Sequence, residues 1–244
     1  TNPEAPSFTN TIAALELSGR PLRRVDMVFS QLASAATNDE MQAIERDMAP
    51  VVTRHWNSIF LNARLFARID QLYRQRNSLG LDAESLRVLE RYHLDFVRAG
   101  AQLTAAERTR YGEISERLSV LATAFAQNVL ADEQQIFALT EAEVQGLPPD
   151  ALAAAAELAR DRKLNAPYAA STSRSSVEPI LHHASDRGVR EKLWRAFVDR
   201  GRNGNAYDNR KLIAEIVALR GEIAALLGYA SYADYKLADT MAGS

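Results

Sequence analysis

Residues 104–136, TAAERTRYGEISERLSVLATAFAQNVLADEQQI, form the stretch that decides the fold. Thr104 and Glu107 have the spacing of a capping box, in which each side chain satisfies a free backbone N–H at the start of a helix. Apolar residues then recur every three or four positions, which is typical of a helix with one buried face. The predicted buried stripe consists of Leu118, Leu121, Phe125 and Val129. We therefore expect one long helix from Thr104 to about Ile136.

The same helical spacing extends outward in both directions. A long helix is predicted from Asn38 to Tyr73 with a kink or break at Pro50, and later helices at about 149–163, 186–200 and 208–227. The fold class expected is mainly α, a multi-helix array of antiparallel helices with short loops. Residues 165–178 differ, because Ser, Thr, Ala and Pro replace the periodicity, and they are predicted as a loop or a small β-hairpin. We expect residues 1–244 to form a single helical domain, with a possible subdivision near 137–180.

Composition excludes several classes of partner and site. A formal net charge of -2 argues against a general binder of nucleic acid or of anionic membranes, so neither partner is expected. No run of about 18 apolar residues is present, so no membrane span is predicted. The sequence contains no Cys, which excludes disulfides, Cys-ligated zinc and Cys nucleophiles.

The four histidines do not have the spacing of a zinc peptidase site. Such a site needs two imidazoles one helical turn apart, a third ligand, and a carboxylate that polarises the metal-bound water. Glu178, His182 and Asp186 fall at i, i+4 and i+8 and could share one helix face, but a solvated turn capped by Asp186 accounts for the same residues. His55 and His93 are interpreted as core or boundary histidines rather than ligands, and His183 points away from its neighbour His182.

No other local motif specifies an activity. The segment 186–202 is rich in cations, but Asp186, Glu191 and Asp199 alternate with them, which favours a solvated helix face with ion pairs four residues apart. Those cations are Arg187, Arg190, Lys192, Arg195, Arg200 and Arg202. Neither a G-x-S-x-G elbow nor a Gly-rich phosphate loop occurs. We assign no catalytic, cofactor-binding or metal-binding residue to this chain.

Longer strings carry a family resemblance. Residues 2–11, NPEAPSFTNT, resemble the "NP…P-x-F-x-N-T" passage of the thimet oligopeptidase and peptidyl-dipeptidase family of zinc metallopeptidases. Further strings are similar to that family in the same order. They are ERDMAP (45–50), Leu61-Asn62, Leu65-Phe66, Leu89-Glu90-Arg91, FVRAGA (96–101), REKL (190–193), Asp208-Asn209, IVALR (216–220), Leu226 to Tyr229 and Tyr232-Ala233. The resemblance covers essentially the whole chain and looks nearest to the bacterial peptidyl-dipeptidase branch.

The resemblance implies a role for the chain within a larger protein. In that family the N-terminal helices, as in the neurolysin-like N-terminal region, form one wall of a deep channel that admits short unstructured peptides. The zinc, its H-E-x-x-H helix and a third ligand, a Glu, belong to the C-terminal half, and none of these motifs can be placed on this sequence. We therefore expect a fragment of a zinc peptidase whose partners are short peptides and the missing catalytic half, and which by itself holds no zinc and hydrolyses nothing. The resemblance implies a cytoplasmic location, or a periplasmic one if a leader was removed.

Two other interpretations stay open at this point. One is a stand-alone helical module, derived from such a peptidase, that binds a peptide or protein. The other is an enzyme with a different site built on these helices, which the few His and the absence of Cys disfavour. A large exposed apolar patch would favour the fragment, since an independent module is expected to cover it.

Overall fold

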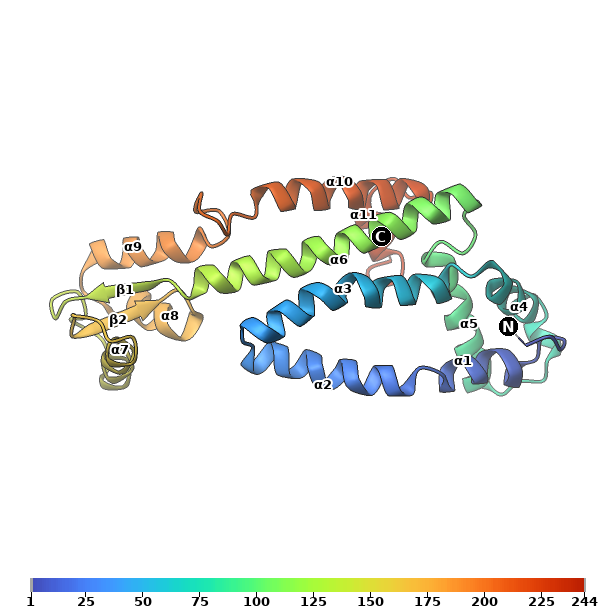
Figure 1. The fold of residues 1–244 in the computed structure, drawn as a ribbon, viewed down its shortest axis with the longest axis horizontal. Coiled ribbons are helices and arrows are strands. Elements are labelled where there is room, and N and C mark those ends of the chain that lie inside the picture. The colour runs from blue at the N-terminus through green and yellow to red at the C-terminus, as the bar shows by residue number, and fades with distance from the viewer. Residues whose placement is uncertain (1, 244) are drawn as a thin grey trace. The chain divides into compact units, whose positions relative to one another are not determined.

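The computed structural model describes residues 2–243 and is mainly helical, with one small sheet (Figure 1). The N-terminal elements are the π-helix η1 (Phe8–Ala13), α1 (Ala14–Leu17), α2 (Arg20–Ala36), α3 (Asp39–Phe60), α4 (Ala63–Arg74), the 3-10 helix η2 (Arg76–Ser78) and α5 (Ala83–Arg98). They are followed by α6 (Ala105–Glu133), β1 (Ile136–Leu139), α7 (Pro149–Asp161), β2 (Tyr168–Ser171), α8 (Arg174–His183), α9 (Arg187–Val198), α10 (Arg210–Leu226) and α11 (Tyr232–Leu237). The predicted fold class is confirmed. Within the described residues, no helix combines the length and the apolar character that a membrane crossing requires.

The chain divides into two compact units. Residues 1–123 and 216–244 form unit 1, and residues 124–215 form unit 2. Both boundaries fall inside helices, α6 and α10. The expectation of a single domain, with a possible subdivision near 137–180, stays a prediction.

The core of unit 1 lies where η1, α4 and α5 meet. Its fully buried side chains include Ile12 of η1, Ile69 and Leu72 of α4, and Leu89 and Phe96 of α5. Burial of such side chains contributes about 1.5–3 kcal/mol each. This cluster fixes α5, which carries part of the site described below.

The long helix predicted for residues 38–73 is broken, but not at Pro50. Asn38 caps α3 as expected, with its side chain accepting a hydrogen bond from the Met41 N–H at 2.9 Å. The helix continues through Pro50 and ends at Phe60. Asn62 then starts α4 by accepting from the Leu65 N–H at 3.0 Å. The break therefore lies at Asn62, the residue that caps the new helix. Its side chain satisfies a backbone N–H that the first turn of α4 leaves free.

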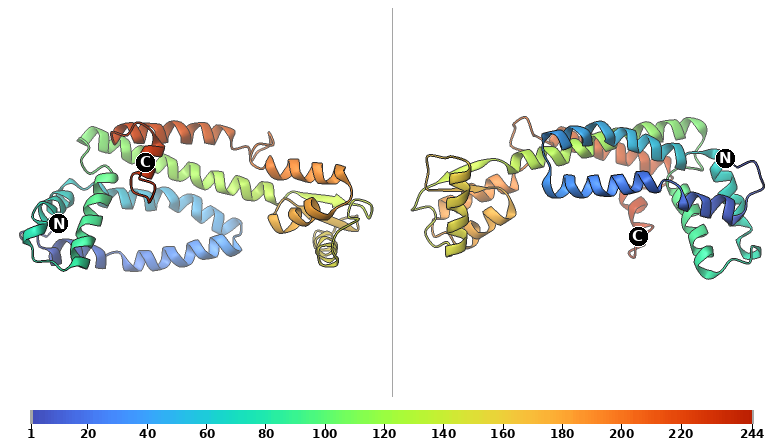
Figure 2. Two further views of the ribbon diagram at one scale, coloured as in Figure 1. Left: turned by 180° about the vertical axis from the view of Figure 1, so that it is seen from behind. Right: turned by 60° about the horizontal axis from the view of Figure 1, so that its bottom comes forward.

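Helices α2 and α3 bury none of their residues. They are joined by residues 37–38 and run in opposite directions (Figure 2). Six apolar side chains, three on each helix, are at least 42% exposed and fall into two stripes. We define the α2 stripe as Val25, Val28 and Leu32, and the α3 stripe as Ile44, Met48 and Val51. The spacing within each stripe places its members on one helix face.

Unit 2 is built around the sheet. β1 and β2 pair antiparallel, with Ile136 opposite Ser171 and Leu139 opposite Tyr168. Helices α7, α8 and α9 gather around this sheet (Figure 2). The core joins Leu139 and Ala170 of the strands to buried side chains of the helices, namely Val177, Ile180, Val189 and Leu193.

The sequence predictions for this region need three corrections. Helix α6 ends at Glu133 rather than near Ile136, and residues 136–139 form β1, a strand too short to show alternation of its own. The element expected at 165–178 contains β2, but its partner is β1, and the last residues of the segment belong to α8. Phe125, predicted to be buried, is 37% exposed.

Candidate functional site

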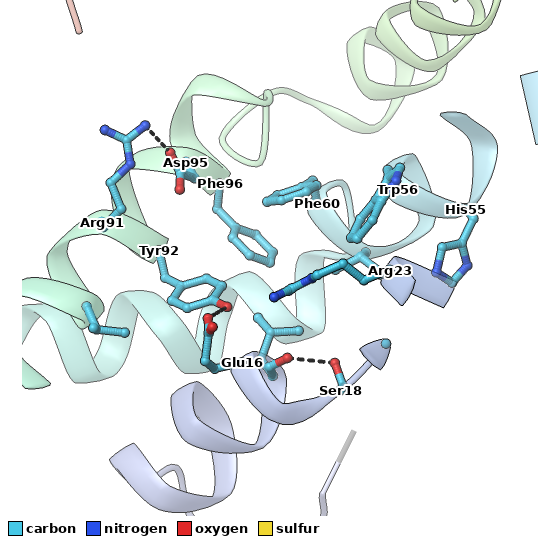
Figure 3. A pocket seen from close by; sticks show the side chains of 14 residues that line it. Glu16, Ser18, Arg23, His55, Trp56, Phe60, Arg91, Tyr92, Asp95 and Phe96 are labelled. Carbon is cyan, nitrogen blue, oxygen red and sulfur yellow. Dashed lines mark hydrogen bonds and ion pairs between the residues drawn. The ribbon is translucent and has the colours of Figure 1, made fainter. Parts of the chain in front are cut away.

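An aromatic pocket lies in unit 1 between the end of α1, α3 and α5 (Figure 3). Its volume is about 390 Å³, within the usual range for small-ligand sites. Trp56 and Phe60 of α3 face Tyr92 and Phe96 of α5 across it. The ring centroids of Phe60 and Phe96 are 4.9 Å apart, and those of Trp56 and Phe60 are 6.3 Å apart. Because Phe96 is fully buried in the core of unit 1, this wall of the pocket is held rigidly.

The two acidic side chains of this pocket already have partners. Glu16 accepts a hydrogen bond from the hydroxyl of Tyr92. Burial and this contact with the carboxylate raise the pKa of Tyr92 well above its ordinary value, so its hydroxyl remains a donor at neutral pH. Asp95 pairs with Arg91 at 2.6 Å, and Arg91 also contacts Asp239 at 2.7 Å.

Arg23 is the charged side chain of this pocket that has no such partner among residues 2–243. Its side chain comes from the first turns of α2, and its guanidinium points toward the space between Phe96 and Glu16 (Figure 3). The guanidinium forms no hydrogen bond or ion pair with any residue in the part of the chain that the structure describes. The pocket therefore presents one available cation beside a group of aromatic rings.

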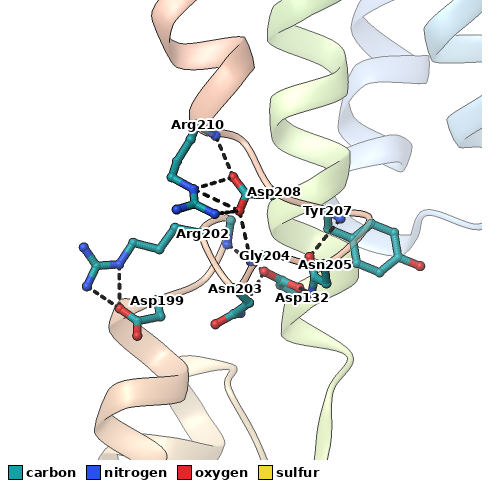
Figure 4. A network of polar contacts seen from close by, with 10 residues as sticks. Asp132, Asp199, Arg202, Asn203, Gly204, Asn205, Tyr207, Asp208 and Arg210 are labelled. Atoms are coloured by element: carbon teal, nitrogen blue, oxygen red, sulfur yellow. Dashed lines mark hydrogen bonds and ion pairs between the residues drawn. The ribbon is translucent and has the colours of Figure 1, made fainter.

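A second polar centre lies in unit 2 around Asp132, near the end of α6 (Figure 4). Asp132 is 3% exposed. One of its carboxylate oxygens accepts from the Gly201 N–H at 2.7 Å and from the Asn203 side chain at 3.1 Å, and the other accepts from the Asn205 side chain at 2.7 Å. The carboxylate thus organises residues 201–205, a loop with no regular hydrogen bonding of its own.

Buried Asn209 closes the same loop. Its backbone N–H donates to the Gly201 carbonyl at 2.6 Å. Its side-chain oxygen accepts from the Asn128 amide at 2.9 Å, and its side-chain NH₂ donates to the Phe125 carbonyl at 3.1 Å. Beside it, hydrogen bonds from Arg210 hold the pKa of the Asp208 carboxyl well below its usual range. These contacts are structural, since every buried polar group they involve is satisfied within the protein.

The structure separates the histidines. His93 is confirmed as a boundary histidine: its side chain is 14% exposed, its Nε2 lies 3.2 Å from Asp70, and its ring stacks on Tyr73 with a centroid distance of 3.8 Å. His55 is exposed rather than part of the core, and it lies at the edge of the aromatic pocket against Trp56.

The possible alignment of Glu178, His182 and Asp186 on one helix is wrong. Helix α8 ends at His183, so Asp186 lies beyond it. Asp186 instead caps α9 by accepting from the Gly188 N–H at 2.6 Å, and Glu178 pairs with Arg174 at 3.0 Å. The alternative of a turn with a capping Asp is confirmed.

The cation-rich segment 186–202 is likewise mostly committed to contacts within the chain. Arg195 pairs with Glu191 at 2.7 Å, four residues earlier, as the spacing predicted. Arg200 pairs with Glu133, and Arg202 pairs with Asp199 at 2.6 Å. This segment is a solvated helix face with interleaved charges, as expected.

The residues present do not fit the zinc that the family resemblance implies. Residues 2–243 contain no group of three or more His, Cys, Asp or Glu side chains placed to hold a metal ion. A zinc site needs three or four such donors converging on one point. We assign no step of hydrolysis to this chain, and its lack of a cofactor stays a prediction.

Comparison with known proteins bears on the family. The family model described as peptidase family M3 matches residues 180–244. A dipeptidyl carboxypeptidase of Escherichia coli is 37% identical over 243 residues, and one of Salmonella typhimurium is 39% identical over the same length. The chain is a relative of the M3 peptidases. A third relative, oligopeptidase A of Escherichia coli, is 30% identical over 236 residues.

The match with these M3 peptidases covers nearly all of this chain but a minor part of theirs. It extends over 99% of the chain and 36% of the length of each dipeptidyl carboxypeptidase, and over 91% and 35% for oligopeptidase A. The matched part is N-terminal in the relatives. The resemblance seen in the short strings is thereby confirmed.

The sequence predicted neither the aromatic pocket nor the polar centre around Asp132. The aromatic side chains of the pocket lie on helices whose apolar residues recur at helical spacing, and periodicity alone does not distinguish a core position from a cavity wall. Asp132 gave no signal because its partners lie 69 or more residues later in the chain. The Gly- and Asn-rich composition of residues 201–209 was the one available hint of an ordered turn.

Proposed function

We propose that this chain is the N-terminal, non-catalytic region of a zinc-dependent M3 peptidase of the peptidyl-dipeptidase type, and that it contributes part of the wall of a peptide channel. The observation that carries the proposal is the match along nearly the whole chain to N-terminal parts of dipeptidyl carboxypeptidases. The chemistry of peptide hydrolysis then belongs to a different part of the protein. The wall supplies contacts along the peptide and a limit on the size of the substrate.

The apolar surface of unit 1 supports this proposal over a stand-alone module. The α2 stripe is 53–68% exposed and the α3 stripe 42–47% exposed. Exposed apolar patches of this kind mark surfaces that pack against another protein part. We propose that the catalytic part of the peptidase covers these stripes.

Fragment complementation tests the proposal. Residues 1–244 and the remainder of the native gene product are prepared separately, and cleavage of an internally quenched oligopeptide is measured for each and for the mixture. We expect no cleavage by residues 1–244, with or without added zinc, and cleavage by the mixture that a chelator abolishes. Cleavage by residues 1–244 alone would overturn the proposal.

Substitutions in the α2 stripe identify the surface involved. Val28→Asp places a charge in the stripe, whereas Ser34→Asp places the same charge on the opposite side of α2. We expect Val28→Asp to weaken complementation and Ser34→Asp to leave it unchanged. If residues 1–244 form a stand-alone module, the mixture gains no activity and the two variants behave alike.

A further inference from the structure

The aromatic pocket of unit 1 combines features that a packing defect does not require. Its volume of about 390 Å³ is open to solvent, and rings from α3 and α5 line opposite sides. Phe60 and Phe96 pack against each other, with ring centroids 4.9 Å apart, and so form the closed inner end of the pocket. A planar ring or another apolar side chain can enter it without rearrangement of the helices.

The charges of the pocket determine what would accompany that ring. Glu16 and Asp95 are engaged by Tyr92 and Arg91, respectively. The guanidinium of Arg23 points inward and has no carboxylate partner among residues 2–243. A guanidinium matches a carboxylate with two parallel hydrogen bonds, and this match is stronger than a hydrogen bond between neutral groups.

We infer that this pocket binds a carboxylate that is attached next to an aromatic ring, as in the C-terminal residue of a peptide ending in Phe, Tyr or Trp. The ring lies among Trp56, Phe60 and Tyr92, and the carboxylate pairs with Arg23. Free aromatic amino acids carry the same two groups. The inference concerns unit 1 alone and does not depend on the proposed peptidase function.

Ligands of the opposite charge fit the pocket less well. A cation would lie close to the positive charge of Arg23, and Asp95 is already paired with Arg91. Glu16 keeps its negative charge, because the Tyr92 hydroxyl that donates to it is neutral. A purely apolar ligand would form no hydrogen bond with Arg23, so Arg23 would add nothing to its affinity. The selectivity of the pocket for acids over amides therefore measures the contribution of Arg23.

Fluorescence of Trp56 reports on binding directly. The chain has two Trp, so Trp194→Phe leaves Trp56 as the single emitter beside the pocket. The Trp194→Phe chain is titrated with N-acetylphenylalanine, with N-acetylphenylalaninamide and with free phenylalanine. We expect saturable binding of the acid that is about tenfold tighter than binding of the neutral amide, since one charge-assisted contact distinguishes them.

Two substitutions separate the role of Arg23 from a general effect of charge. Arg23→Gln is expected to weaken binding of the acid about tenfold and to leave binding of the amide unchanged. Arg24→Gln removes a neighbouring cation that does not line the pocket, and we expect it to change neither. Circular dichroism of the exposed-site variants checks that each remains folded.

The results show whether the pocket binds such a carboxylate and, if it does, whether the ligand is a peptide C-terminus or a free amino acid. Tighter binding of N-acetylphenylalanine than of phenylalanine supports a peptide C-terminus, and the reverse order supports a free amino acid. Equal affinity for acid and amide, or wild-type affinity in Arg23→Gln, would overturn the assignment. So would a lack of saturable binding by all three compounds.

Discussion

Replacing Asp132 should lower the free energy of unfolding of unit 2, because one carboxylate accepts several hydrogen bonds there. Asp132→Ala removes the acceptor of three hydrogen bonds to the loop 201–205. The Gly201 N–H is buried, so losing its acceptor costs about 1–3 kcal/mol. The amides of Asn203 and Asn205 belong to exposed residues and can bind water instead, which limits their share to about 0.5–1 kcal/mol each.

The expected total for Asp132→Ala is a loss of about 2–5 kcal/mol in the free energy of unfolding of unit 2. Asp132→Asn keeps one oxygen for Gly201 but turns an NH₂ group toward a donor, so a smaller loss of about 1 kcal/mol is expected. Asp199→Ala serves as the control, because it removes a partly exposed ion pair with Arg202 whose contribution is within about 1 kcal/mol.

Urea unfolding followed by Trp194 fluorescence measures these losses. Trp194 lies on α9 of unit 2, and Trp56→Phe removes the signal from unit 1. Hydrogen exchange of residues 200–209 shows whether the loop itself loses protection. If Asp132→Ala unfolds within about 0.5 kcal/mol of the parent and its loop stays protected, the assignment of Asp132 as the organiser of the loop is refuted.

Three further predictions concern the frame of the molecule. Phe96→Ala deletes a fully buried ring and should cost about 3–5 kcal/mol in urea unfolding of unit 1; a loss below 1 kcal/mol would contradict the packing described. Gly146→Ala adds a Cβ 2.4 Å from a backbone oxygen at a φ of +94°, so it should lower the melting temperature more than Gly80→Ala, whose Cβ meets no atom within 4 Å; equal effects would contradict this reason. Hydrogen bonds at the start of α5 hold the pKa of Asp82 below its ordinary 3.8, so the stability it contributes is present at neutral pH and is lost as the pH falls through that lowered pKa. Asp82→Ala should therefore destabilise the chain more at pH 7 than at a pH below that lowered pKa, as measured by thermal unfolding over a pH series; an effect independent of pH would contradict the role of the charge.

How far the sequence predicts this structure depends on the range of the interactions involved. The capping box was predicted correctly, because Thr104 and Glu107 are three residues apart and their hydrogen bonds are local. The break in the long helix was misplaced, because Pro50 is a known helix breaker and was assigned the break. The helix instead continues through Pro50, and Asn62 starts the next helix as its cap. Helix starts and ends were therefore predicted correctly where a single local interaction determines them.

Interactions between distant segments account for the errors and the omissions. Strand β1 exists because β2, about thirty residues later, supplies its hydrogen bonds, and four residues are too few to show a period. Asp132 and the aromatic pocket depend in the same way on side chains brought together by folding. The exposed α2 and α3 stripes could not be distinguished from core-facing ones, since periodicity reports an apolar face and not what covers it.

Peptide hydrolysis by the full native gene product tests the central claim most directly. The product is compared with residues 1–244 on one internally quenched oligopeptide, before and after treatment with a chelator and after return of zinc. The account predicts zinc-dependent cleavage by the full product and none by residues 1–244. Cleavage by residues 1–244, or a full product that cleaves no oligopeptide in the presence of zinc, would contradict it.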